Sequence, residues 1–467
     1  MGCTLAIDQG THASRAILFD DAGNEIAKSV VEVKLHRLDA ARVEQSAEQL
    51  LQSVNTAVAD VLAQGAGRKI TACGLATQRS TVLGWQADGD AITPALSWQD
   101  VRAAAALEAL KPQAEDIQRI SGLPLSAHYG ASKIQWLAAR TEYKQADRIS
   151  PLVSYLLYHL LAEKPYLVDH CNAQRTQLFD LEKLNWSESL CKLFAVERRL
   201  LPDCKPICHR YGVLKAAAIP LTAVSGDQNA AFYAAGSPAP DVALVNLGTG
   251  AFALRALTHY CSSQKQLSGV ALSSAETITW LREATVNGAG SALAWVAEKY
   301  QITDSREALP RWLDEVAAPP LFINSVGGLG SPWWNAQITP HFLEENLTPA
   351  QRMCAVVESI LFMLQANLEL MHNESRLQGL RVSGGLSNLD ALCQKLANLS
   401  GLPVERGMAP EATARGIAWL AAGQPRHWDT RKQSTLFTPL HDAGIQSRYH
   451  AAMESLQALL IAQDNTL

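Results

Sequence analysis

Short apolar runs separated by turn residues mark the first part of the chain. Residues 4–7, 14–19 and 25–33 each have the length and the alternation of a β-strand. A helical spacing of apolar residues extends from 46 to about 63, and residues 70–76 predict a buried strand. Strands that alternate with helices in this way indicate an α/β protein, with functional residues expected at the ends of the strands.

The opening hairpin pattern occurs a second time in the middle of the chain. Residues 243–247 predict an apolar strand, Gly248-Thr249-Gly250 a tight turn and residues 251–256 a returning strand. A repeated unit in a chain of 467 residues indicates two similar domains. The Gly- and Pro-containing stretch 236–240 predicts the boundary, so we expect domains at 1–238 and 239–467.

The tips of both hairpins have residues that suit phosphate binding. Glycine lets backbone N–H groups approach a phosphate, and the hydroxyls of Thr11 and Thr249 add donors. Asp8 lies beside the first tip, where a carboxylate holds Mg²⁺ directly or through water. An ordinary β-turn explains either hairpin alone, whereas two such hairpins favour a site that holds both ends of a triphosphate.

Two further strand ends carry candidate chemistry. Residues 221–225 predict a strand, and Gly226-Asp227-Gln228 follow it at the start of a helix. An Asp in this place is often only a helix cap, but a carboxylate facing a cleft also accepts the proton of a hydroxyl that attacks a γ-phosphate. Gly384-Gly385 ends another strand before a helix at about 389–399, and its exposed backbone suits contact with a nucleotide.

Composition narrows the class of partners. The chain is 48% hydrophobic and 18% charged, which is typical of a globular protein, and its net charge is −5 without a basic block. No signal-peptide pattern, no apolar run near the roughly 18 residues of a membrane span and no CxxC pair occur in the sequence. We therefore expect a cytoplasmic protein with no nucleic-acid or membrane partner, and leave open whether it is a monomer or a homodimer.

The order of the motifs resembles that of the FGGY family of carbohydrate kinases, and the glycerol kinases in particular. The similarity extends from about residue 4 to 425 and implies an α/β fold with two actin/hexokinase-like (ribonuclease H-like) domains around a central cleft. It also implies that ATP, Mg²⁺ and a small polyol or sugar bind there. The motifs that carry the resemblance are Asp-Gln-Gly-Thr at 8–11, Gln-Arg at 78–79, Trp-Gln-Asp at 98–100, Lys-Ile-Gln-Trp at 133–136, Gly-Asp-Gln at 226–228, Gly-Thr-Gly at 248–250, Gly-Leu-Gly-Ser-Pro-Trp-Trp at 328–334 and Gly-Gly at 384–385.

The resemblance implies roles for the matching positions. Asp227 matches the catalytic base of the family, and Asp8 together with Asp227 matches its metal site. The implied nucleotide contacts are Thr11, Ser14, Arg15, Gly248, Thr249, Gly290 and Gly385. The implied acceptor contacts are Arg79, Ser80, Trp98, His128, Asp227, Gln228 and Phe252. Among these, the rings of Trp98 and Phe252 would press on carbon faces, while Arg79 and Gln228 would bond hydroxyl groups.

Some positions depart from the glycerol kinase pattern. Ser80 stands where those enzymes have Glu, and His128 stands where they have Tyr. A carboxylate that accepts bonds from two hydroxyls is a strong contact, so its loss is expected to weaken glycerol binding and leave room for a larger acceptor. On the nucleotide side, Ala294 and Leu389 replace polar residues. A structural interpretation also exists for His128, as a turn or surface residue, and for Lys133, as a solvated helix lysine.

We predict direct in-line phosphoryl transfer to a hydroxyl of a small polyol or sugar, with Asp227 as the general base. Two alternatives are a kinase of pentuloses or other ketoses and a non-catalytic sugar sensor on a kinase scaffold. Asp8, Thr11, Asp227 and Thr249 argue against the sensor, because a protein that no longer transfers phosphate has no need of them.

Overall fold

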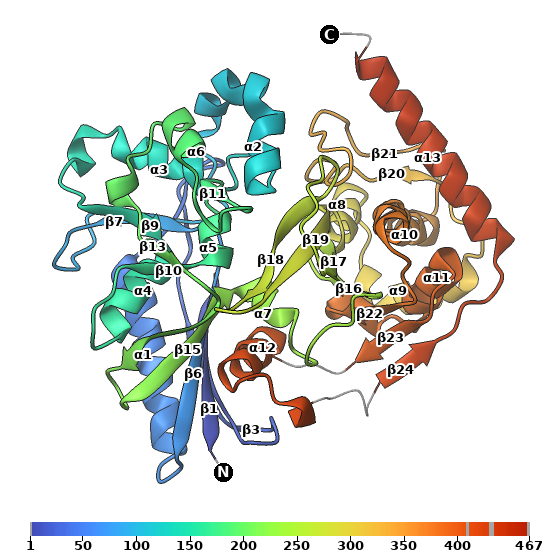
Figure 1. Cartoon of the computed structure of the whole chain (residues 1–467). Coiled ribbons are helices and arrows are strands. Elements are labelled where there is room, and N and C mark those ends of the chain that lie inside the picture. The colour runs from blue at the N-terminus through green and yellow to red at the C-terminus, as the bar shows by residue number, and fades with distance from the viewer. Residues whose placement is uncertain (1, 408–410, 429–433, 465–467) are drawn as a thin grey trace.

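Two mixed β-sheets organise the chain (Figure 1). The computed structural model describes residues 2–407, 411–428 and 434–464. The first sheet has the order β14-β15-β6-β1-β2-β3. Its strands are β1 (Cys3–Gln9), β2 (Ala13–Phe19), β3 (Glu25–Glu32), β6 (Ile70–Thr77), β14 (Cys208–Leu214) and β15 (Ile219–Gly226). The strands predicted from the apolar runs in this part of the chain are thus confirmed.

The second sheet repeats the plan of the first. Its order is β18-β19-β17-β16-β22-β23-β24. In both sheets an antiparallel hairpin, β1–β2 or β16–β17, is followed by two parallel strands, β6 and β15 or β22 and β23. The strands are β16 (Val242–Leu247), β17 (Ala251–Leu257), β18 (Leu267–Ser273), β19 (Ile278–Val286), β22 (Gly379–Ser383), β23 (Val404–Gly407) and β24 (Ser434–Phe437). This shared topology confirms the recurrence that the hairpin pattern predicts.

Helices from distant parts of the sequence cover the first sheet. Helix α1 (Ala47–Gln64) packs on β1, β2 and β3, and begins at Ser46, whose hydroxyl accepts the N–H of Gln49. Helix α12 (Ala412–Ala421) packs against β1, β6 and β15, and its residues Ile417 and Trp419 lie in the same hydrophobic core. The boundary at 238/239 remains a prediction, but α12 shows that the last third of the chain contributes to the core of the first sheet.

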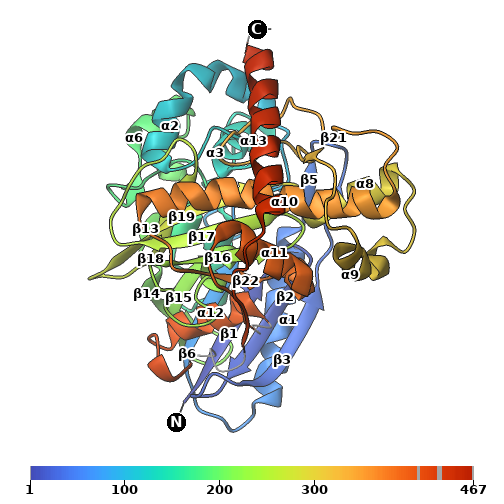
Figure 2. The same ribbon diagram turned by 90° about the vertical axis from the view of Figure 1, so that its right-hand side faces the viewer.

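The second sheet is packed against α10 (Pro349–Glu374), the long helix that crosses the molecule in Figure 2. By length and composition, α10 alone among the described helices suffices to cross a membrane, but 78% of its most apolar stretch is buried inside the protein. It is the central helix of this half of the molecule. Around it lie α8 (Gly290–Lys299), α9 (Ser305–Glu315), α11 (Asp390–Ser400) and the long C-terminal α13 (Ala443–Asp464).

A smaller five-stranded sheet, with the order β4-β5-β8-β7-β9, extends the first half of the molecule. Its strands are β4 (His36–Arg37), β5 (Val43–Gln45), β7 (Val82–Trp85), β8 (Ala95–Leu96) and β9 (Arg148–Pro151). Helix α3 (Gly130–Ala138) packs against β7 and β9. The remaining elements used below are α5 (His170–Gln174), α7 (Asp227–Ala231) and the 3-10 helix η4 (Gly385–Asn388). Short elements connect them, namely η1 (Ala104–Gln113), α2 (Ala114–Ser121), η2 (Thr141–Tyr143), α4 (Leu152–Leu160), β10 (Leu167–Asp169), β11 (Phe179–Asp180), β12 (Asn185–Trp186), α6 (Glu188–Leu193), η3 (Arg198–Leu200), β13 (Asp203–Lys205), β20 (Phe322–Ile323), β21 (His341–Phe342) and η5 (Arg426–Trp428).

Candidate active site

A cavity of about 320 Å³ lies where the two sheets approach each other, a size typical of small-molecule sites. The first hairpin, the start of α7, the second hairpin and the start of α12 all contribute to its wall. The lining residues are Asp8, Arg15, Asp227, Gln228, Ala231, Phe232, Leu244, Asn246, Phe252, Leu254, Ser383, Glu411, Ala412 and Thr413. Five of the residues predicted from sequence, namely Asp8, Arg15, Asp227, Gln228 and Phe252, are therefore brought together.

The first hairpin places a carboxylate and a guanidinium group side by side. Asp8 and Arg15 are register partners on β1 and β2, and the Arg15 guanidinium lies 3.6 Å from the Asp8 carboxylate. Arg15 also lies 3.4 Å from the carboxylate of Glu411, which forms a second ion pair with Lys28. Burial, together with the nearby carboxylates of Asp227 and Glu411, raises the pKa of Asp8 to about 7 against the lowering effect of Arg15.

Ser14 requires a correction. Its hydroxyl is fully buried and lies 2.7 Å from the hydroxyl of Ser53 on α1. Successive side chains on a strand point to opposite faces, so Ser14 must face α1 when its neighbour Arg15 faces the cavity. The sequence pattern placed both side chains on one phosphate loop, which the alternation of β2 does not allow.

Asp227 stands at the end of β15 and is the first residue of α7. Its carboxylate accepts the backbone N–H of Gln228 at 2.7 Å, and 33% of the side chain remains exposed to the cavity. Burial raises its pKa, while the cation of Arg79, 3.7 Å away, acts in the opposite direction. A carboxylate with a raised pKa that is open to a cleft is suited to accept a proton from a bound hydroxyl.

Arg79 connects the residues around this carboxylate. Its side chain is only 10% exposed, donates to the Asn229 amide oxygen at 2.8 Å and also to the amide oxygen of Gln228. Its guanidinium lies 3.5 Å from Glu283 on β19. Glu283 in turn pairs with Arg175, and although burial raises its pKa, these two arginines bring it below the usual value. The result is a buried Arg–Glu–Arg group that fixes Arg79 beside Asp227.

Ser80 also requires a correction. It lies in a left-handed backbone conformation with φ of 63°, is 3% exposed and donates its hydroxyl to the Arg175 carbonyl at 3.1 Å. It is absent from the lining of the cavity. The expected contact between Ser80 and an acceptor is therefore replaced by a structural bond that supports the Arg175 backbone.

Trp98 and His128 form a pair beside the first hairpin. Their ring centroids are 5.5 Å apart, and the Trp98 indole donates to the Thr11 hydroxyl at 2.9 Å. Both rings are half-buried. Burial lowers the pKa of His128 to about 3, with Lys133, Arg175 and Arg79 acting in the same direction, so its imidazole is neutral near pH 7. His128 is thus packed against Trp98, in contrast to its interpretation as a surface histidine.

The second hairpin packs closely against the start of α8. The N–H of Gly290 donates to the Gly248 carbonyl at 3.0 Å, and that of Ser291 donates to the Thr249 carbonyl at 3.0 Å. A methyl group added at Gly290 would lie 2.9 Å from the Gly248 oxygen. Gly290 thus allows this approach, and Thr249 remains exposed at the tip.

The two glycines after β22 differ in their surroundings. Gly384 has φ of 92°, and a methyl group there would lie 2.6 Å from the Leu247 carbonyl oxygen. Gly385 is exposed, and no atom lies within 4 Å of the corresponding position. Nearby, Leu389 precedes α11, while Ala294 is exposed on α8. Gly384 therefore lets the backbone pack closely against Leu247, and Gly385 leaves the backbone next to it open to a ligand.

The sequence interpretation overlooked several residues of this site. Glu411 follows a strand and precedes a helix, the same pattern that identifies Asp227, and it lines the cavity. Glu283 lies next to Arg282 in the middle of β19, and charged residues inside a buried strand are an available signal of ion pairs with other elements. Asn229 was overlooked although it belongs to the Gly-Asp-Gln motif region.

Solved structures with the same architecture identify the fold. The chain superposes on a Plasmodium falciparum glycerol kinase with ADP with a TM-score of 0.87, at 23% identity and over 98% of each chain. It superposes on a xylulose kinase from Rhodospirillum rubrum with a TM-score of 0.88, at 17% identity and over 99% of each chain. The fold is thus the two-domain, actin/hexokinase-like fold of sugar kinases, as expected.

Sequence comparison gives the family. Residues 3–233 match the N-terminal domain and residues 243–424 the C-terminal domain of the FGGY family of carbohydrate kinases. A glycerol kinase from Synechocystis sp. is 32% identical over 471 residues, covering 94% of each chain, and one from Geobacter sp. is 32% identical over 441 residues, covering 89% of each. The chain belongs to the FGGY family of carbohydrate kinases. It phosphorylates a hydroxyl of a carbohydrate or polyol, kinases of this family use ATP, and the sugar-sensor alternative is not favoured.

Proposed function

We propose that this kinase transfers the γ-phosphoryl group of ATP to a hydroxyl of a small polyol, with Asp227 as the general base. The observation that carries the proposal is the position of the Asp227 carboxylate, open to the cavity and 3.7 Å from the Arg79 guanidinium. Arg79 keeps the carboxylate oriented, and a hydroxyl bonded to Asp227 loses its proton as it attacks the phosphorus. Closure of the two halves then excludes water, so that ATP is not hydrolysed.

The donor set of the cavity fits a magnesium ion. Asp8 and Asp227 supply the carboxylate oxygens that Mg²⁺ prefers, and a bound cation would relieve both the burial of the Asp8 charge and its repulsion from Asp227, which raise the pKa of Asp8. When bound with ATP, the ion would neutralise charge on the phosphates. We assign Thr11, Arg15, Gly248 and Thr249 to the phosphates.

The adenosine is assigned to the exposed backbone at Gly385, with Gly290 supporting the second hairpin from α8. This assignment rests on the matching family positions and on the open space above Gly385. Ala294 and Leu389 are compatible with it, because adenosine contacts are largely apolar.

The acceptor is assigned to the region between Trp98, Phe252 and the Arg79–Gln228 pair. Phe252 lines the cavity, and Arg79 orients the Gln228 amide by bonding its oxygen, which leaves the amide N–H groups for a hydroxyl. Relatives named glycerol kinases support a glycerol-sized polyol. Because Ser80 supplies no carboxylate, we infer that a polyol or ketose larger than glycerol, such as a pentulose, is the second candidate.

A cytoplasmic location remains part of the proposal.

The test is ADP release in a coupled assay with Mg·ATP and a panel of glycerol, erythritol, pentitols, pentuloses and hexoses. Strong turnover on glycerol or erythritol supports the polyol assignment, and preference for a pentulose replaces it. If no compound of the panel causes ADP release while ATP still binds, the acceptor assignment is contradicted. Loss of ATP binding as well contradicts the assignment of both hairpins.

A further inference from the structure

Lys133 on α3 is one of the largest completely buried side chains of the molecule. The sequence pattern suggests a solvated helix lysine, so its position is a correction. Its ammonium donates to three backbone carbonyls, those of His128 at 2.7 Å, Ala127 at 3.1 Å and Asp100 at 3.5 Å. Among the described residues it forms no ion pair. The hydrogen bonds of the ammonium are therefore all to main-chain oxygens in the described part of the chain.

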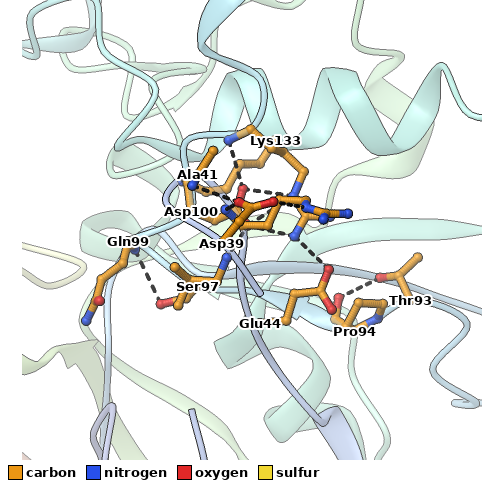
Figure 3. Close-up of polar contacts among 12 residues, drawn as sticks. Asp39, Ala41, Glu44, Thr93, Pro94, Ser97, Gln99, Asp100 and Lys133 are labelled. Atoms are coloured by element: carbon orange, nitrogen blue, oxygen red, sulfur yellow. Dashed lines mark hydrogen bonds and ion pairs between the residues drawn. The ribbon is translucent and has the colours of Figure 1, made fainter. Parts of the chain in front are cut away.

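These carbonyls belong to two separate loops. Asp100 lies two residues after Trp98, and His128 is the ring packed against Trp98. Figure 3 shows Lys133 directed at the Asp100 loop, on the side opposite Glu44. On the Glu44 side of this loop, the Asp100 carboxylate accepts the N–H of Val43 at 2.8 Å and a bond from Arg102. Arg102 also donates to Glu44 at 2.6 Å. One ammonium thus joins the loop of Trp98 to the loop of His128, while β5 fixes the first loop from the other side.

Burial of an ammonium group is costly, and here it lowers the pKa of Lys133 to about 7, against the raising effect of Asp100. An apolar side chain of equal length would fill the same volume without that cost. The three bonds are what the lysine adds, since a buried carbonyl that is left without a donor destabilises the fold.

We propose that Lys133 is a positioning residue for the acceptor: it sets the distance between the loops that carry Trp98 and His128, and thereby the affinity and size selectivity for the polyol or sugar. This inference rests on the proposed acceptor site. Lys133 touches no reacting atom in this assignment, and it acts on the acceptor through the two rings.

The variants are Lys133→Met, which keeps the length and removes the donors, and Lys133→Gln, which keeps an N–H donor. Lys395→Met is the matched control, because Lys395 is also largely buried but pairs with Glu358 on α10, away from these loops. Hydrogen exchange is measured first, because it does not require turnover. Lys133→Met should accelerate exchange in residues 97–102 and 126–129 at least tenfold relative to Lys395→Met. Equal exchange in these loops, or uniform acceleration across the chain, overturns the proposal.

Steady-state kinetics then uses glycerol, or the panel member with the highest kcat/KM. Lys133→Met should raise the acceptor KM at least tenfold and leave the ATP KM within twofold, and Lys133→Gln should fall between wild type and Met. Parallel rises in both KM values, or an unchanged acceptor KM, contradict the positioning role. If Lys133→Met does not fold, Lys133→Gln alone carries both readouts. A wild-type enzyme that is silent on the panel contradicts the proposed acceptor, and the exchange experiment still decides whether Lys133 joins the two loops.

Discussion

The two sides of the cleft differ in the chemical groups that form them: mainly side chains on one side and mainly backbone on the other. On the side assigned to the acceptor, the site is formed by side chains. Arg79 donates hydrogen bonds to Gln228 and Asn229. It also forms ion pairs with Asp227 and Glu283. On the side assigned to the nucleotide, the backbone is presented instead, at the Gly248–Gly250 turn and at Gly384–Gly385.

This difference predicts that the two sides tolerate substitution differently. A site made of backbone keeps its shape when neighbouring side chains change, as with the exposed Ala294 and the half-buried Leu389. A site made of side chains changes its chemistry with one substitution, as at Ser80 and His128. The sequence therefore predicts the class of kinase, but it does not predict the identity of the acceptor.

The largest effect is expected for Asp227→Asn. The amide keeps the shape of the side chain but cannot accept the hydroxyl proton, so kcat should fall about 10²- to 10⁴-fold. Thermal stability should stay the same or rise, because burial raises the pKa of this acid and makes its charged form costly. The control is Asp180→Asn, an acid that accepts two backbone N–H groups in a turn and does not line the cavity. Retention of more than a few per cent of wild-type kcat would remove Asp227 from its role.

The paired variants Gly384→Ala and Gly385→Ala test whether the nucleotide side depends on backbone. At Gly384 an alanine needs φ of 92° and collides with the Leu247 carbonyl, which should lower the free energy of unfolding by about 1–3 kcal/mol. At Gly385 the added methyl group meets no protein atom, so stability should be unchanged and only the ATP KM should rise. Chemical denaturation and ATP titration measure the two effects. An unchanged ATP KM for Gly385→Ala contradicts the adenosine assignment.

Local sequence signals predicted most of the elements around the cleft. The hairpins, α1, β6, β15, β22 and α11 follow from apolar spacing and turn residues. The packing of α12 on the first sheet did not follow, because no local pattern states which of two similar sheets a late helix will cover. The direction of the Ser14 side chain was available from the alternation along its strand, whereas Ser80 lies in a left-handed backbone conformation that no local pattern predicts.

His128 provides a test of the buried, side-chain-built acceptor side through pH. Its pKa of about 3 in the folded protein lies below the usual value near 6.5, so the unfolded chain binds more protons between these values. Stability should therefore fall as pH decreases from about 6.5 towards 3. Urea denaturation of wild type and His128→Gln at pH 7.0 and 4.5 measures this. The variant should lose less stability on acidification, by on the order of 1–2 kcal/mol. Equal losses would mean that His128 accepts a proton as easily in the folded as in the unfolded protein.

The smallest effect is expected for Glu411→Gln. This variant tests a side chain on the phosphate side, which is otherwise formed mainly by backbone. Glu411 pairs with Arg15 and Lys28 at the cavity wall, with 23% of its side chain exposed. Without its charge, Arg15 retains Asp8 as its anionic partner among the described residues, and its orientation towards the phosphates is weakened. Partly exposed ion pairs contribute up to about 1 kcal/mol, which corresponds to a rise in the ATP KM of about threefold to fivefold.

Glu405→Gln is the matched control for this prediction, because Glu405 forms a similarly exposed ion pair with Arg381 and does not line the cavity. The acceptor KM should not change in either variant, since the ion pairs of Glu411 are with Arg15 on the first hairpin and Lys28 on β3. A fall in the ATP KM for Glu411→Gln would show that the carboxylate repels the triphosphate more than it orients Arg15. In that case the phosphate side would depend on its backbone and on Arg15 alone, and the contrast with the acceptor side would be sharper still.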